Sequence, residues 1–141
     1  MPHQTIVLLG NLPADTVPLD LLVEKFGWSL EKAATFNSLR DLAAGRDVVA
    51  VLFEASMWSL PWSEVLRLVL DAAPNALPIL CHRFSDTLPW PELADAGAFH
   101  AMPLPLASGE VRQSLGFVWA ARSRTDKRRT ATPGEIAAIV A

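Results

Sequence analysis

The 141-residue chain contains a single cysteine, Cys81. One thiol cannot form an internal disulfide, and multi-cysteine zinc sites need a second thiolate, so both are excluded. The first Lys or Arg is Lys25, which leaves no basic region for a secretory signal. No charge-free apolar run approaches the roughly 18 residues of a membrane span. We therefore expect a cytoplasmic chain without membrane association, in which Cys81 is a small buried residue.

Charge is also scarce, since charged residues make up 19% of the chain and hydrophobic residues 51%. This composition supplies the core of one domain. Residues 1–121 hold 7 Lys/Arg and 13 Asp/Glu, a net charge of −6, whereas residues 122–141 hold 5 and 2, a net charge of +3. An acidic body argues against nucleic acid as a partner, because phosphate recognition needs basic residues spread over one face.

Several catalytic and cofactor patterns are missing as well. The three histidines, His3, His82 and His100, lie in unrelated segments without metal-ligand spacing and without a Ser-His-Asp arrangement. The turn at residues 10–13, Gly-Asn-Leu-Pro, lacks the repeated glycines that cradle a nucleotide phosphate. We therefore expect no cofactor, no metal and no enzymatic activity.

Short apolar runs alternate with amphipathic segments along the chain. Strands are predicted at residues 5–9, 28–34, 48–53, 78–82 and 98–104, and helices at 18–26, from Asn37 or Ser38 to 43, at 61–73, at 92–96 and from Ser108 onward. The alternation predicts a flavodoxin-like, doubly wound parallel sheet of order 2-1-3-4-5 with helices on both faces. We assign this domain to residues 1–121. Residues 122–141 are expected to form a basic linker and then a short helix that begins at Thr132.

Two segments carry a family resemblance. One is the run Asp47–Glu54, and the other is Ala96-Gly97-Ala98-Phe99 followed by Leu104-Pro105-Leu106. With the order of elements, they resemble the receiver (CheY-like) domains of bacterial two-component response regulators over about residues 5–121. The resemblance implies a phosphorelay signalling function and an aspartate phosphoacceptor at the end of the third strand.

The residues at the positions that the resemblance marks as functional depart from the receiver pattern. Gly10 and Asn11 stand where receivers carry an acidic pair that holds magnesium, and Glu54 stands at the phosphoacceptor position. After the fourth strand, receivers carry a Thr or Ser whose hydroxyl contacts the phosphoryl oxygens, and this chain has His82 and Arg83 there. At the end of the fifth strand, receivers carry a lysine followed by a proline, and this chain has Leu104 in place of the lysine. We therefore expect a pseudo-receiver that has lost phosphotransfer.

Glu54 has three interpretations. It is a strand-end carboxylate that is hydrogen-bonded or paired with Arg83, or a fixed negative charge that imitates a phosphorylated or metal-bound state, or a true phosphoacceptor. Trp58, Trp62 and Trp90 fall in or next to the loops at the same sheet edge. They either fill volume around the altered pocket or form an apolar interaction rim.

Three functions remain open. The first is a pseudo-receiver signalling module that acts through contacts with a protein partner, either a signalling kinase or an output protein, and also through a homodimer. The second is an atypical receiver that is still regulated within a phosphorelay. The third is a small flavodoxin-like ligand-binding protein that uses the three tryptophans.

Overall fold

The structure is a computed structural model that describes residues 4–10, 18–54, 58, 60–83, 90–104 and 106–130, with the backbone alone at positions 83, 90 and 125–130. Asn11 and the short helix expected from Thr132 lie outside the described residues. No helix among the described residues is both long and apolar enough to cross a membrane.

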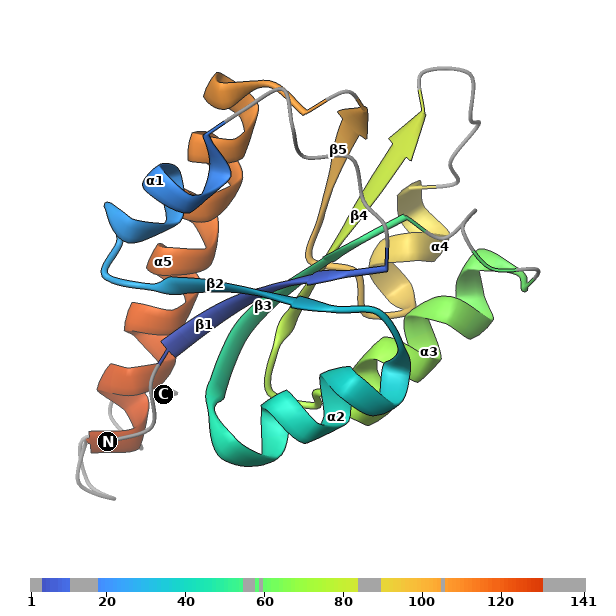
Figure 1. Ribbon diagram of the computed structural model, residues 1–141, viewed down its shortest axis with the longest axis horizontal. Helices are drawn as coiled ribbons and strands as arrows, with labels where there is room; N and C mark the ends of the chain where they lie inside the picture. Colours follow the sequence, from blue (N-terminus) through green and yellow to red (C-terminus); the bar gives the residue numbers. More distant parts are fainter. Residues whose placement is uncertain are drawn as a thin grey trace, which may run out of the picture.

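Five parallel strands form one sheet (Figure 1). They are β1 (Gln4–Leu9), β2 (Ser29–Ala33), β3 (Asp47–Phe53), β4 (Leu77–Arg83) and β5 (His100–Leu104). Their order is β2-β1-β3-β4-β5, which confirms the predicted flavodoxin-like topology. The most apolar run of the chain, β3, occupies the centre, as expected for a strand covered on both faces.

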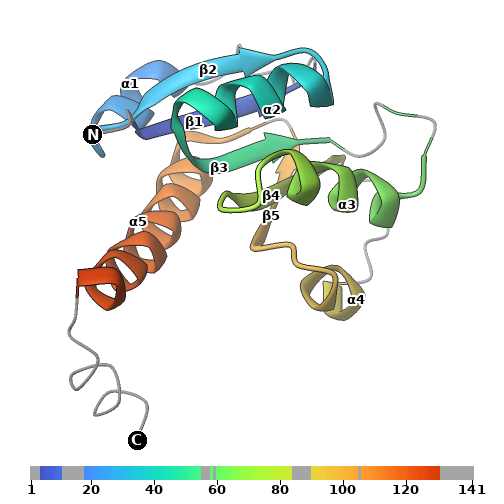
Figure 2. The same ribbon diagram turned by 90° about the horizontal axis from the view of Figure 1, so that it is seen from below.

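Helices cover both faces of the sheet (Figure 2). They are α1 (Leu19–Glu24), α2 (Phe36–Gly45), α3 (Trp62–Ala72), α4 (Trp90–Asp95) and α5 (Ser108–Thr130). One core cluster joins the sheet to α1 and α5, and a second joins it to α2, α3 and α4. Successive strand residues point to opposite faces, so Leu52 belongs to the first cluster and Phe53 to the second.

The amino end of α2 differs from the prediction. Neither Asn37 nor Ser38 is the cap; Thr35 precedes the helix in an extended conformation and accepts a hydrogen bond from the Ser38 backbone at 3.1 Å. The hydroxyl thus satisfies one of the backbone donors left open in the first turn. Asn37 instead lies inside the helix and accepts a hydrogen bond from Arg40.

The domain boundary expected at residue 121 stays a prediction, but the helix that crosses it is longer than the sequence predicted. The helix α5 continues through the basic segment to Thr130 and does not give way to a linker. Residues 122–130 contain neither glycine nor proline, and Arg and Lys favour the helical conformation. Arg122 is also buried against the sheet, so the segment begins as part of the folded body.

Candidate functional site at the carboxyl ends of the strands

The carboxyl ends of the parallel strands meet at one edge of the sheet, where ligands bind in open α/β folds. Here β1 ends at Leu9 and is followed by Gly10, which has a positive φ of 79°. The Gly10 backbone donates a hydrogen bond to the carbonyl of Ala33 at 2.7 Å, which fixes the turn after β1 against the end of β2. A glycine permits this conformation but offers no side-chain ligand.

Glu54 follows the last residue of β3 and is only 2% exposed. A carboxylate at this depth requires compensating contacts, because transfer of an unpaired charge from water is costly. Glu54 is not without an interaction partner. The structure therefore places the carboxyl group inside the sheet edge, at the position where the sequence predicted it.

Cys81 in β4 lies close enough to Glu54 to be influenced by its charge. The thiol is 1% exposed, which confirms the predicted buried role. The pKa of Cys81 is raised to about 12, mainly by burial and also by the charge of Glu54, while a hydrogen bond with the Phe53 backbone acts in the opposite direction. The thiol is thus protonated at neutral pH and is not a nucleophile, since the thiolate is the reactive form.

The ends of β4 and β5 lie side by side, with His82 paired to Pro103 and Arg83 paired to Leu104. His82 is half-buried and is not without an interaction partner. Leu104 is half-buried and packs against the core cluster of α1 and α5. An apolar side chain in this position cannot donate a hydrogen bond to an anion.

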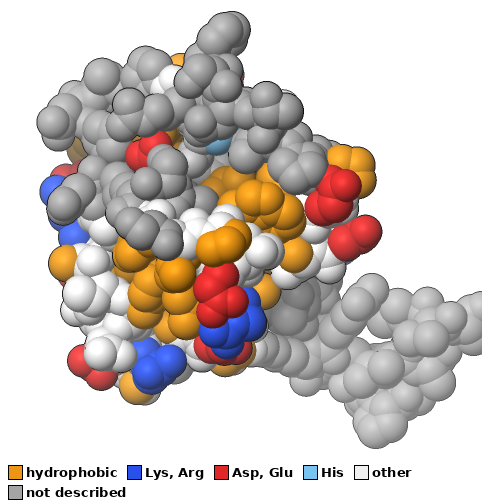
Figure 3. Space-filling view, turned by 90° about the vertical axis from the view of Figure 1, so that its right-hand side faces the viewer, with side chains coloured by type: hydrophobic (Ala, Val, Ile, Leu, Met, Phe, Trp, Pro, Cys, Tyr) orange, Lys and Arg blue, Asp and Glu red, His pale blue; other side chains and the backbone are white. Residues whose placement is uncertain are grey.

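Two of the three tryptophans at this edge have described side chains. Trp58 and Trp62 are half-buried and pack against the core cluster of α2, α3 and α4. The Trp58 ring also lies against Phe36, with centroids 5.0 Å apart and planes tilted by 34°. Trp90 begins α4, and its side chain lies outside the description. Hydrophobic side chains gather in patches on the side of the molecule that carries α3 and α4 (Figure 3).

The residues that are described do not match the oxygen-rich coordination that magnesium requires. Magnesium prefers several oxygen ligands in octahedral geometry. Gly10 has no side chain and the Leu104 side chain has no polar atom, so among the described residues at the ends of β1, β3 and β5 Glu54 is the one that can ionise. Within the described ranges, no group of three or more His, Cys, Asp or Glu residues is placed to hold a metal ion.

A polar cluster that the sequence did not reveal lies at the opposite, amino end of the sheet. Asp47 begins β3 and forms an ion pair with Arg122 of α5 at 2.5 Å. The same carboxylate accepts a hydrogen bond from the Gln4 side chain at 3.4 Å. Gln4 in turn accepts a hydrogen bond from the Trp28 indole at 3.2 Å, and Arg122 donates to the carbonyl of Asn75 at 3.3 Å. These contacts join β1, β3 and α5 to the segment between α3 and β4 and to the residue before β2.

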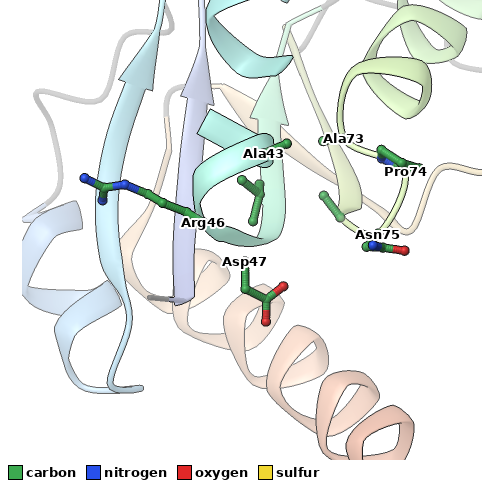
Figure 4. Close-up of a pocket in the computed structure, with 8 residues that line it drawn as sticks. Ala43, Arg46, Asp47, Ala73, Pro74 and Asn75 are labelled. Atoms are coloured by element: carbon green, nitrogen blue, oxygen red, sulfur yellow. The ribbon is translucent and has the colours of Figure 1, made fainter. Parts of the chain in front are cut away.

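A hollow of about 130 Å³ lies beside this cluster, between the ends of α2 and α3 (Figure 4). In this view the Asp47 carboxylate points toward α5 and the Arg46 side chain points toward β2. Arg46 pairs there with Glu31 at 2.9 Å. Most of the remaining lining residues are small, so the hollow offers no group of convergent polar side chains.

Comparisons with solved structures support the fold. The chain is similar to a receiver domain protein from Methanospirillum hungatei, with 15% identity, a TM-score of 0.67, and coverage of 87% of this chain and 98% of the other. A response regulator from Thermotoga maritima gives 11% identity, a TM-score of 0.68, and coverage of 84% and 98%.

A third similar structure is the receiver domain of a sensor histidine kinase from Pseudomonas aeruginosa, which has a magnesium ion coordinated in its active site cleft. It gives 14% identity, a TM-score of 0.61, and coverage of 84% and 98%. Neither protein-family models nor curated protein sequences give a match. The chain therefore has the fold of response regulator receiver domains over nearly their full length.

Proposed function

We propose that this chain is a receiver-like signalling module that acts through protein contacts without aspartyl phosphorylation. The observation that carries the proposal is the set of residues at the strand ends. A buried Glu54 lies after β3, and Gly10 and Leu104 lie at the ends of β1 and β5. Phosphoryl transfer to a carboxylate needs charge neutralisation around the incoming phosphoryl group, and this set does not provide it.

The role of Glu54 in this proposal is that of a permanent negative charge. A charged group can bias a two-state domain in the way that a phosphoryl group does, by interacting differently with the two conformations. Glu54 is buried and engaged in contacts, so its charge is held in one place. The partner would be a kinase or an output protein that recognises the resulting surface.

A magnesium titration followed by calorimetry tests the chemical part of the proposal. We expect no saturable binding in the millimolar range, because one carboxylate with two apolar neighbours binds magnesium poorly. The variant Glu54→Gln is the matched control, since it removes the charge with little change in shape. Saturable magnesium binding that is lost in Glu54→Gln would contradict the proposal and favour an atypical receiver that is still regulated in a phosphorelay.

A further inference from the structure

The guanidinium of Arg122 is held by an incomplete set of acceptors at the amino end of the sheet. Its two terminal nitrogens donate to the Asp47 carboxylate at 2.5 Å and to the carbonyl of Asn75 at 3.3 Å. Its remaining donor, Nε, is buried and has no hydrogen-bond partner among the described residues. A buried donor without a partner costs free energy, because its hydration is lost and not replaced. The contact that holds Arg122 is therefore weaker than a fully satisfied one.

Arg122 is also the last point at which α5 is buried against the body of the protein. Val118 and Arg122 are buried, whereas Arg124 is exposed. Among the side chains that the structure describes, none after Arg122 is buried, and the helix continues to Thr130 away from the strands (Figure 2). The ion pair with Asp47 therefore controls how the basic end of α5 is held.

The hollow of about 130 Å³ beside this pair is lined by the same two residues that hold the guanidinium, Asp47 and Asn75. The Asp47 side chain is 25% exposed, compared with 7% for Arg122. Gln4 and Arg122 both donate to Oδ2 of Asp47, so within the described ranges no donor is bound to Oδ1. An incoming donor therefore has an acceptor on this carboxylate that Arg122 does not use.

The electrostatic surroundings of the hollow favour a positive charge. It lies where α2 ends at Gly45 and α3 ends at Ala72, and the carboxyl ends of helices carry a partial negative charge. Neither helix has a Lys or Arg in its last turn. Arg46 is the one base in the lining, and its side chain points toward β2, where it pairs with Glu31 at 2.9 Å (Figure 4). Arg122 is thus the cation that offsets these charges, and another cation can take its place.

We propose that this hollow is a regulatory site for a cationic side chain of a protein partner, a lysine or an arginine, which competes with Arg122 for Asp47 and Asn75 and so releases the end of α5. The contacts of Arg122 show which chemistry the site accepts, a carboxylate and a carbonyl that bind a planar cation. The competing cation favours the released state, because only that state leaves both acceptors free. The inference does not depend on whether Glu54 accepts a phosphoryl group.

An NMR titration of the full chain with methylguanidinium tests this proposal, because that ion is the charged head of an arginine side chain. Urea, which has a similar planar shape and no charge, is the control. With methylguanidinium we expect saturable shifts of the Asp47 and Asn75 amides in the millimolar range. The indole resonance of Trp28 should shift as well, since it donates to Gln4, which shares Oδ2 of the carboxylate. Amide hydrogen exchange of residues 120–124 should become about threefold faster or more as Arg122 is released.

The variant Arg122→Ala distinguishes competition from binding at a neighbouring place. Without the intramolecular occupant, methylguanidinium should bind about tenfold more tightly or better, and saturating amounts should restore part of the lost thermal stability. Asp47→Asn should abolish the shifts, whereas Asp41→Asn, which changes an exposed carboxylate of α2, should leave them unchanged.

The unaltered chain keeps the test decisive if a variant does not fold, because methylguanidinium and urea are compared on the same protein. A response to methylguanidinium that is no larger than the response to urea would overturn the proposal. An unchanged affinity in a folded Arg122→Ala variant would overturn it as well, since the two cations would then not compete.

Discussion

The guanidinium of Arg122 and the carboxylate of Asp47, 75 residues apart in the sequence, form an ion pair at 2.5 Å with side-chain exposures of 7% and 25%. The pair connects the middle of α5 to the amino end of β3. It lies at the opposite end of the sheet from Glu54, because Asp47 begins the strand after which Glu54 follows. The direction of the projecting end of α5 is therefore set by a contact far from the candidate site.

Removal of one partner of this pair should destabilise the domain. Asp47→Ala leaves the Arg122 guanidinium buried without its counter-ion, and we expect a loss of about 3–5 kcal/mol in the free energy of unfolding. The double variant Asp47→Ala/Arg122→Met should lose less than the sum of the single changes, because neither charge is then left alone. Urea denaturation of the four proteins measures this coupling.

The matched control for that experiment is Arg67, which forms ion pairs with Glu64 and Asp71 on the exposed face of α3. We expect Arg67→Ala to have little effect on stability, since exposed ion pairs contribute little. Equal losses from Asp47→Ala and Arg67→Ala would show that the Asp47–Arg122 pair does not anchor α5.

The buried Cys81 thiol should make the stability of the protein depend on pH in the alkaline range. The pKa of Cys81 rises from 9.0 to about 12 in the folded protein, so between these values the unfolded chain releases a proton that the folded chain retains. Stability should therefore be unaffected below pH 9 and fall above it, by up to about 1.4 kcal/mol per pH unit. Cys81→Ser removes this thiol titration, so its stability should fall less steeply. Parallel slopes for the two proteins would contradict the assignment.

Replacing the glycine in the turn before β5 with a larger residue should destabilise the fold. Gly97 has a φ of 109°, and a Cβ atom added there would lie 2.9 Å from Leu70. Gly27 also has a positive φ, 79°, but its surroundings are open. We expect Gly97→Ala to lower the melting temperature more than Gly27→Ala does, because it adds an overlap to the backbone strain of roughly 1–2 kcal/mol. Equal shifts would mean that Leu70 moves aside.

His100 provides a local electrostatic test. Partial burial lowers the pKa of His100 from 6.5, and the charge of Glu110 opposes this effect. The variant Glu110→Gln should therefore lower the pKa of His100 further, and Phe117→Ala, which exposes the ring to water, should raise it. NMR titration of the imidazole measures both shifts, and an unchanged pKa in Glu110→Gln would show that the two groups do not interact.

The sheet could be predicted because each strand is marked by residues that are adjacent in the sequence. Each strand is a short apolar run, and the alternation of strands and helices allows few topologies. The runs at β1 and β3 have few competing interpretations, since continuous β-branched and aliphatic residues are typical of buried parallel strands. The position of Glu54 at the sheet edge follows from the same reasoning.

Contacts between distant segments could not be predicted in this way. Nothing in the sequence near Asp47 indicates Arg122, and the basic segment around Arg122 has the composition of a solvated linker. The packing of Trp58 on Phe36 is likewise a product of the tertiary structure. Such pairs depend on how α2, α3 and α5 lie on the sheet, which hydrophobic periodicity alone does not encode.

The most direct test of the account is the intact mass of the protein after incubation with a small phosphodonor and magnesium, beside an active receiver domain treated in the same way. If Glu54 does not accept a phosphoryl group, the active receiver gains 80 Da, the mass of one phosphoryl group, while this chain keeps its mass. Stoichiometric gain of 80 Da, mapped to Glu54 and lost in Glu54→Gln, would contradict it.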